Sequence, residues 1–247
     1  MSKTILISSG DQHFSAYLVE PTGAVKGAII VIHEVWGLTE HIKSIADRFA
    51  NEGYLALAPD LFSGNGIDVE KLNDLQSSLF DPEKRIEAQP KLRLLMAPIQ
   101  SPEFGQVTLE KTKACFDYLD NLDGIDGKIG ITGFCFGGTY SFSLAVHEPK
   151  LKVSIPFYGH ADFSVNQLKY ITCPVMAFYG ETDENLINAL PELKQKMSQA
   201  GVNFTAQVYK DCGHAFFNDS NKFTYNLEAA TDSWSKSLAL IKTCFKN

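Results

Sequence analysis

The feature that most constrains the fold is an alternation of short apolar runs with segments of helical period. The apolar runs cover residues 28–33, 54–58, 128–133, 153–158, 174–180 and 203–209. Such runs are typical of strands buried on both faces of a parallel sheet. Apolar residues spaced by three and four predict helices at 40–52, 108–122, 137–147, 186–200 and 224–245. The alternation predicts an α/β fold, a mostly parallel, doubly wound sheet with helices on both faces.

Three segments depart from this alternation. Residues 4–8 and 14–20 precede it and predict a leading antiparallel strand pair. Residues 61–107 hold four prolines and many charges, and they predict an irregular insertion with one or two short helices. That insertion is either a wall over a site or a plain surface excursion. No linker interrupts the pattern, so residues 1–247 are expected to form a single domain.

The last predicted helix has its own apolar stripe. The stripe consists of Leu227, Ala230, Trp234, Leu238, Ile241 and Phe245. We expect this stripe to dock on the sheet.

Composition excludes several classes of protein. A net charge of −7 argues against nucleic acid as a partner, because phosphate binding needs a basic face. No stretch approaches the roughly 20 apolar residues of a membrane span, and the first apolar run is too short for a signal peptide. The five cysteines show neither paired nor metal-like spacing, which favours free thiols. We therefore expect a cytoplasmic protein.

A cysteine framed by glycines lies between one predicted strand and the next helix. The segment reads Gly133-Phe-Cys135-Phe-Gly137-Gly138. A strand, a Gly-x-Cys-x-Gly turn and a helix have the form of the nucleophile elbow of α/β-hydrolases, with cysteine in place of serine. The turn would place the thiol at a helix N-terminus, where the dipole and free N–H groups favour a thiolate. The alternative is a small core cysteine in a Gly-rich turn.

A thiol nucleophile needs a base and a carboxylate that orients the base. In α/β-hydrolases the chain order is nucleophile, acid, histidine. The strand at 174–180 leads into a loop rich in carboxylates. The pattern Tyr-Gly-x-x-Asp favours Asp183 as the orienting acid, although Glu184 would be nearly as good a candidate by its position alone. The strand at 203–209 leads to His214, whereas His160 precedes the acid and breaks the order. We predict a triad of Cys135, Asp183 and His214.

Glu34 is a fourth candidate, in the loop that follows the buried strand at 28–33. This fold usually takes an oxyanion-hole N–H group from that loop. A carboxylate there is unusual for a hydrolase, because it faces the place where negative charge develops. Taken alone, Glu34 is better interpreted as a solvated loop residue.

At these residues the sequence resembles the dienelactone hydrolase family (carboxymethylenebutenolidases) over nearly its whole length. The landmarks are His-Glu34-Val-Trp-Gly-Leu, Gly-Tyr54-Leu-Ala-Leu-Ala-Pro-Asp-Leu-Phe62, Gly-Phe-Cys135-Phe-Gly-Gly, Tyr-Gly-Glu-Thr-Asp183 and Gly-His214-Ala-Phe-Phe-Asn-Asp. The resemblance implies an α/β-hydrolase that cleaves a lactone or carboxylic ester through a thioester on Cys135, with His214 as base. It also implies that Glu34 interacts with the resting thiol and helps to form the thiolate.

The resemblance extends to the oxyanion hole and to cofactors. It implies that the backbone N–H groups of Phe136 and Val35 hold the oxyanion. It implies no metal and no organic cofactor. The aromatic residues Trp36, Tyr158 and Phe217 lie next to predicted site loops, so they are candidates to line an apolar pocket. The alternative is that they are ordinary core residues.

One position departs from the family. Enzymes that act on dienelactone hold its carboxylate with arginines, one of them four residues after the catalytic histidine. Asn218 occupies that position here, and Arg85, Arg93 and Lys222 are candidate replacements. Without a bidentate clamp, affinity for an anionic lactone should weaken, which favours another ester as substrate.

Two other functions remain open at the level of sequence. One is a general carboxylesterase or thioesterase on the same scaffold. The other is a non-enzymatic protein that binds a ligand or senses redox state through Cys135. The expected partner is a small-molecule ester or lactone, with neither nucleic acid nor membrane, and the sequence is compatible with both a monomer and a homodimer.

Overall fold

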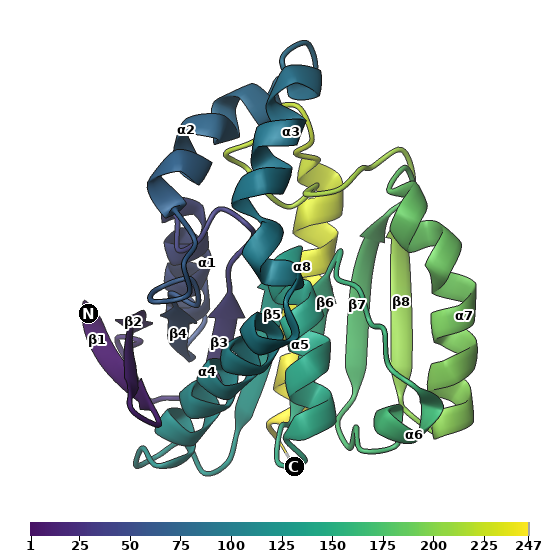
Figure 1. The fold of residues 1–247 in the computed structure, drawn as a ribbon. Helices are drawn as coiled ribbons and strands as arrows, with labels where there is room; N and C mark the ends of the chain where they lie inside the picture. Colours follow the sequence, from purple (N-terminus) through teal and green to yellow (C-terminus); the bar gives the residue numbers. More distant parts are fainter. Residues whose placement is uncertain (247) are drawn as a thin grey trace.

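Eight strands form one sheet in the computed structural model, which describes residues 1–246 (Figure 1). The strands are β1 (Ser2–Ser9), β2 (Gln12–Val19), β3 (Ala28–Ile32), β4 (Leu55–Pro59), β5 (Ile129–Phe134), β6 (Val153–Phe157), β7 (Val175–Gly180) and β8 (Phe204–Tyr209). Their order is β1-β2-β4-β3-β5-β6-β7-β8. β1 pairs antiparallel with β2, and β2 pairs antiparallel with β4, while the remaining pairs are parallel. The predicted sheet and its leading antiparallel pair are confirmed.

Helices cover both faces of the sheet. The main helices are α1 (Glu40–Asn51), α4 (Pro102–Asp120), α5 (Phe136–His147), α7 (Glu184–Ala200) and α8 (Leu227–Cys244), and α6 (Val165–Leu168) is a single turn. Figure 1 shows α1 and α8 behind the sheet and α4 and α5 in front of it. Every residue of β3, β4, β5 and β6 is buried, as strands enclosed between two helical layers must be. The core therefore lies along the central strands.

The insertion is more regular than the sequence suggests. It contains α2 (Val69–Phe80), α3 (Arg85–Leu95) and the short 3-10 helix η1 (Ala97–Gln100), and α4 already begins at Pro102. The Asp68 side chain caps α2 by accepting from the Lys71 N–H, and Leu72 and Leu79 bury one side of that helix. Pro90 lies inside α3 and removes a single helical hydrogen bond. The one or two short helices expected in this segment are present as α2 and α3, and the segment is more regular than expected because Pro90 does not end α3.

The stripe predicted for α8 faces the core except at its first residue. Leu227 is 68% exposed, and the buried residues of the helix are Ala229, Ala230, Ser233, Ser237 and Ile241. The Ser233 and Ser237 hydroxyls donate to backbone carbonyls of the same helix, so small residues bury without unpaired polar atoms. Ala230, Ile241 and Phe245 are buried and Trp234 and Leu238 pack against the core, so the expected docking face is confirmed except at Leu227.

No helix within residues 1–246 is both long enough and apolar enough to cross a membrane. The five cysteines are all free thiols.

Candidate active site

The cysteine turn between β5 and α5 has a strained backbone. Cys135 adopts φ 56° and ψ −110°, a conformation that non-glycine residues rarely take. Its N–H donates to the Phe157 carbonyl at 3.0 Å, and α5 starts at Phe136. The side chain is half-buried. A strained turn that ends at a helix N-terminus is the geometry of a nucleophile elbow.

The glycines of this turn are required by close backbone contacts. A Cβ atom on Gly133 would lie 2.2 Å from the Gly137 carbonyl oxygen. A Cβ atom on Gly137 would lie 2.4 Å from the Ile32 oxygen, and one on Gly138 would lie 2.4 Å from the Phe157 oxygen. No side chain fits at these distances, so the three glycines allow the elbow to pack between β3 and β6.

His214 and Asp183 lie on neighbouring loops and are hydrogen-bonded. Asp183 follows β7, His214 follows β8, and the distance from His214 Nδ1 to Asp183 Oδ2 is 2.5 Å. The two loops are tied together by the Thr182 N–H, which donates to the Cys212 carbonyl at 2.9 Å. Because the carboxylate occupies Nδ1, Nε2 is left to face the thiol. This is the arrangement of a base oriented by an acid.

The charge state of His214 depends on both neighbours. Partial desolvation of the ring acts to lower the pKa of His214, but the charge and hydrogen bonding of Cys135 and Asp183 outweigh that effect and raise the pKa well above its usual value. The imidazolium form is thus favoured when the sulfur is negatively charged. Such a thiolate–imidazolium pair is the reactive form of a histidine-activated cysteine.

A cavity of about 970 Å³ brings the four predicted catalytic side chains together. Cys135, Asp183, His214 and Glu34 all line it. The insertion helices supply one wall through Leu79, Phe80, Arg85, Gln89 and Leu92, and the segment after His214 supplies another through Phe223 and Tyr225. The volume is within the range of small-molecule sites.

Glu34 is almost fully buried and is bound by a side chain from a distant segment. It is 2% exposed, and Asn218 Nδ2 donates to its Oε2 at 2.6 Å. Asn218 Oδ1 in turn accepts from the backbone N–H and the hydroxyl of Ser220. Burial raises the pKa of Glu34 to about 7, although the His214 charge and the Asn218 bond act in the opposite direction. Within residues 1–246, its hydrogen-bond partner is therefore Asn218 and not the thiol.

Two backbone N–H groups next to the thiol are free. Within residues 1–246, neither the Val35 N–H nor the Phe136 N–H has a protein acceptor. Phe136 is the first residue of α5, where helix N–H groups lack intrahelical partners. Val35 is in the loop after β3 and lines the cavity. Each N–H group is therefore available to an acceptor that the described residues do not supply.

Of the other predicted pocket residues, two line the cavity and two do not. Trp36 and Arg85 line the cavity. Tyr158 and Phe217 are 1% exposed and are not among the lining residues. Phe217 packs in the core against Phe134, at 5.3 Å between ring centroids.

Tyr158 lies behind the base. Its ring centroid is 4.9 Å from that of His214, and its buried hydroxyl has no hydrogen-bond partner among residues 1–246. Its backbone φ is 38°, so its conformation is strained like that of Cys135. Tyr158 therefore packs against the His214 ring without lining the cavity.

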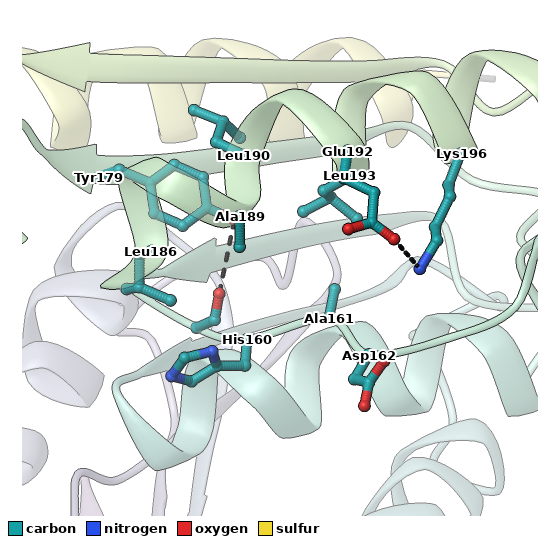
Figure 2. Close-up of a pocket in the computed structure, with 11 residues that line it drawn as sticks. His160, Ala161, Asp162, Tyr179, Leu186, Ala189, Leu190, Glu192, Leu193 and Lys196 are labelled. Atoms are coloured by element: carbon teal, nitrogen blue, oxygen red, sulfur yellow. Dashed lines mark hydrogen bonds and ion pairs between the residues drawn. The ribbon is translucent and has the colours of Figure 1, made fainter. Parts of the chain in front are cut away.

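The alternative cations and the alternative histidine lie elsewhere. Arg93 and Lys222 are exposed and do not line the site cavity. His160 lines a separate cavity of about 270 Å³ between the loop after β6 and α7, shown in Figure 2. That cavity does not include Cys135. His214 is thus the histidine that shares a cavity with the thiol.

Several residues of the cavity were not predicted from the sequence. Leu79, Phe80 and Leu92 belong to the insertion, where the apolar spacing of α2 was the only available signal. Phe223 and Tyr225 lie in a loop without a motif. The bond from Asn218 to Glu34 joins residues 184 positions apart and has no local signal.

The chain is similar to known proteins over almost its whole length. A model of the dienelactone hydrolase family matches residues 14–245. A protein of Saccharolobus solfataricus, provisionally named carboxymethylenebutenolidase, is 32% identical, with 100% of both chains covered. Protein usf of Aquifex pyrophilus is 31% identical over 92% of this chain and 91% of its own length. A crystal structure from Klebsiella pneumoniae, provisionally described as a dienelactone hydrolase, is 26% identical, covers 98% of each chain and has a TM-score of 0.80.

Proposed function

The chain belongs to the dienelactone hydrolase family and is an ester or lactone hydrolase, and we propose that it acts through Cys135 and a thioester intermediate. The observation that carries this proposal is the shared cavity. The strained elbow presents Cys135 to the same space as His214, and His214 is held by Asp183 at 2.5 Å. Nucleophile, base and orienting acid are the three groups that covalent acyl transfer needs.

The proposed reaction has two half-reactions. In the first, the Cys135 thiol gives its proton to His214, and the sulfur attacks the carbonyl carbon of the ester. The Val35 and Phe136 N–H groups hold the resulting oxyanion. The tetrahedral intermediate then collapses to a thioester, and His214 returns the proton to the leaving alkoxide. In a lactone, the alcohol released stays attached to the acyl group.

The second half-reaction is hydrolysis of the thioester. His214 takes a proton from a water molecule, and the resulting hydroxide attacks the thioester carbonyl. The carbon–sulfur bond breaks, the acid leaves, and Cys135 regains its proton from His214.

Glu34 is proposed to help to form the thiolate. It lines the same cavity as Cys135, and the charge on His214 lowers its pKa, so the two charges attract. An ionised Glu34 therefore favours the imidazolium form of His214, and an imidazolium favours the thiolate. Because the pKa of Glu34 is about 7, this effect increases as the pH rises through neutrality.

The charge of the cavity favours an uncharged ester over an anionic lactone, and so supports a general carboxylesterase as the second candidate. Besides Asp183 and Glu34, the carboxylates of Glu184 and Asp211 line the cavity. Among the described residues, Arg85 is the one arginine or lysine of the lining, and its Nε already donates to the Leu79 carbonyl at 2.9 Å. Asn218, in place of a clamping arginine, is bound to Glu34.

A substrate panel tests the nucleophile. The parent, Cys135→Ala and Cys212→Ala are compared on 4-nitrophenyl acetate and on cis-dienelactone. Cys212 is the matched control, since it also lines the cavity. We expect Cys135→Ala to lose turnover by at least ~10³-fold and Cys212→Ala to keep it. Turnover that survives in Cys135→Ala contradicts the mechanism.

A second panel tests the preferred charge of the substrate. It compares 4-nitrophenyl acetate with the 4-nitrophenyl half-ester of succinic acid in the parent and in Arg85→Met. We expect the parent to prefer the uncharged ester, and Arg85→Met to widen that preference by removing the cation. If the parent prefers the half-ester, the substrate is anionic and the proposed preference for an uncharged ester is wrong.

A further inference from the structure

His33, the residue directly after β3, has both ring nitrogens bound although the mechanism above does not use it. The side chain is fully buried, at 0% exposure. The distance from its Nδ1 to the Glu34 carbonyl oxygen is 2.6 Å. The Leu61 N–H donates to its Nε2 at 3.1 Å. The ring therefore joins the loop after β3 to the start of the insertion.

These two partners fix the protonation of the ring. A backbone N–H can only donate, so Nε2 must be the unprotonated nitrogen. A carbonyl oxygen can only accept, so the proton must lie on Nδ1. Burial lowers the pKa of His33 and so keeps the ring neutral, against the opposing charge of Asp60. The imidazole is a neutral donor with one fixed tautomer.

The carbonyl that His33 holds belongs to the same peptide unit as the Val35 N–H. A trans peptide is planar, and its C=O and N–H bonds point in opposite directions. Holding the Glu34 carbonyl thus sets the direction of the Val35 N–H, one of the two free donors described above. The Gly37 N–H donates to the same carbonyl at 3.2 Å, and the bond from His33, at 2.6 Å, is the shorter of the two.

The same ring also contacts the residue that carries the second donor. It stacks on the Phe136 ring with centroids 5.5 Å apart and an interplanar angle of 11°. In addition, the Gly137 N–H donates to the His33 carbonyl at 3.1 Å. One residue therefore contacts both sides of the free N–H pair.

We propose that His33 is a positioning residue that aligns the Val35 N–H with the Phe136 N–H to form the oxyanion hole. This inference rests on the proposed acyl-transfer function. The two hydrogen bonds of the ring have different consequences. The Nδ1–H bond orients the peptide between Glu34 and Val35, whereas the Nε2 bond fixes only the backbone of Leu61.

Two single-nitrogen variants separate these bonds. Asparagine places its amide nitrogen where Nδ1 lies, so His33→Asn can still donate to the Glu34 carbonyl but cannot reach Leu61. Glutamine places its terminal group where Nε2 lies, so His33→Gln can accept from Leu61 but loses the bond to Glu34. Each variant loses one buried hydrogen bond, so we expect similar decreases in Tm.

The readouts are kcat and KM for 4-nitrophenyl acetate. Removing one oxyanion donor outright costs roughly 10²–10³ in kcat, and misaligning it should cost part of that. We expect His33→Gln to lower kcat about 10- to 100-fold with little change in KM, and His33→Asn to remain within about threefold of the parent. Equal losses in the two variants, in proportion to their Tm, would overturn the proposal.

Alkylation of Cys135 by iodoacetamide is the control, because that reaction forms no oxyanion. We expect the alkylation rate of His33→Gln to equal that of the parent. A rate that falls together with ester hydrolysis would mean that the elbow itself is damaged, and the proposal would be wrong. Failure of the acyl-transfer function is distinguishable, since the parent would then lack turnover that depends on Cys135.

Discussion

At the scale of single residues, three features favour Cys135 as a nucleophile: a strained backbone, the N-terminus of α5 and the nearby base His214. The Cys135 φ of 56° stores about 1–3 kcal/mol of backbone strain, which the surrounding contacts must hold in place. The N-terminus of α5 favours negative charge on the sulfur. His214 supplies the positive partner, and its pKa is raised by the charges of Cys135 and Asp183 against the effect of partial desolvation. These conditions distinguish Cys135 from Cys115, which is fully buried with a pKa far above the usual range for a thiol.

Glu34 should cost the protein stability at neutral and alkaline pH. Burial raises its pKa from 4.5 to about 7, so the folded state resists ionisation. The stability that the neutral carboxyl contributes is complete below the unfolded pKa and is lost as the pH rises through about 7. Glu34→Gln should therefore raise the free energy of unfolding at pH 8 by up to about 3 kcal/mol, and by nothing near pH 4.5.

Urea unfolding of the parent and Glu34→Gln at both pH values measures this difference. The same variant should have lower esterase activity, because it cannot favour the imidazolium form of His214. A variant that gains no stability at pH 8, or that gains equally at both pH values, would show that Glu34 is not buried as a weak acid.

Asp183 should matter for catalysis through His214. Asp183→Asn removes the carboxylate that orients the ring and supports its charge, so we expect kcat to fall at least ~10²-fold. Glu184→Gln is the matched control, because Glu184 lines the same cavity but does not bind His214. Steady-state kinetics on 4-nitrophenyl acetate compare the two. Equal activity of the two variants would remove Asp183 from the triad.

At the scale of elements, the site depends on close approaches between strand ends. Gly180 closes β7 so near the next loop that a Cβ atom would lie 2.4 Å from the Gly213 oxygen. This contact holds the loop of Asp183 against the loop of His214. The elbow is held in the same way, between β3 and β6. Rigid elements therefore position the catalytic side chains, although the side chains themselves lie in loops.

Gly137 offers a test of the elbow as an element. Its substitution by alanine would place Cβ 2.4 Å from the Ile32 oxygen, so we expect Gly137→Ala to lower the free energy of unfolding by about 3 kcal/mol or more. Gly105→Ala is the control in α4, where the nearest atom would be Tyr140 Oη at 3.9 Å. It should gain about 0.5–1 kcal/mol from helix propensity. Thermal or urea denaturation compares the two, and a harmless Gly137→Ala would contradict this packing.

At the scale of the whole molecule, the parallel sheet gathers the site. Glu34, Cys135, Asp183 and His214 follow β3, β5, β7 and β8, whose carboxyl ends lie at one edge. Ligands of open α/β sheets bind at that edge. Figure 1 shows α2 and α3 above it, where they complete the cavity.

The strands, their mostly parallel arrangement and the four catalytic candidates could be predicted from the sequence, because buried parallel strands appear as apolar runs and the elbow has a local motif. The order of the strands in the sheet was not predicted. The insertion was less accessible, since Pro90 indicates a helix end and α3 continues through it. The partnership of Glu34 with Asn218 and the burial of Phe217 were not accessible. Both depend on contacts between segments that are far apart in the chain, and neither leaves a local pattern.

The central claim is that Cys135 carries the acyl group during turnover. Its most direct test is the intact mass of the parent, quenched with acid during hydrolysis of a slowly deacylated aryl ester, followed by peptide mapping. We predict a mass increase equal to one acyl group, located on Cys135, sensitive to hydroxylamine as a thioester is, and absent from Cys135→Ala. Rapid turnover with no adduct, or an adduct on another residue, would contradict the account.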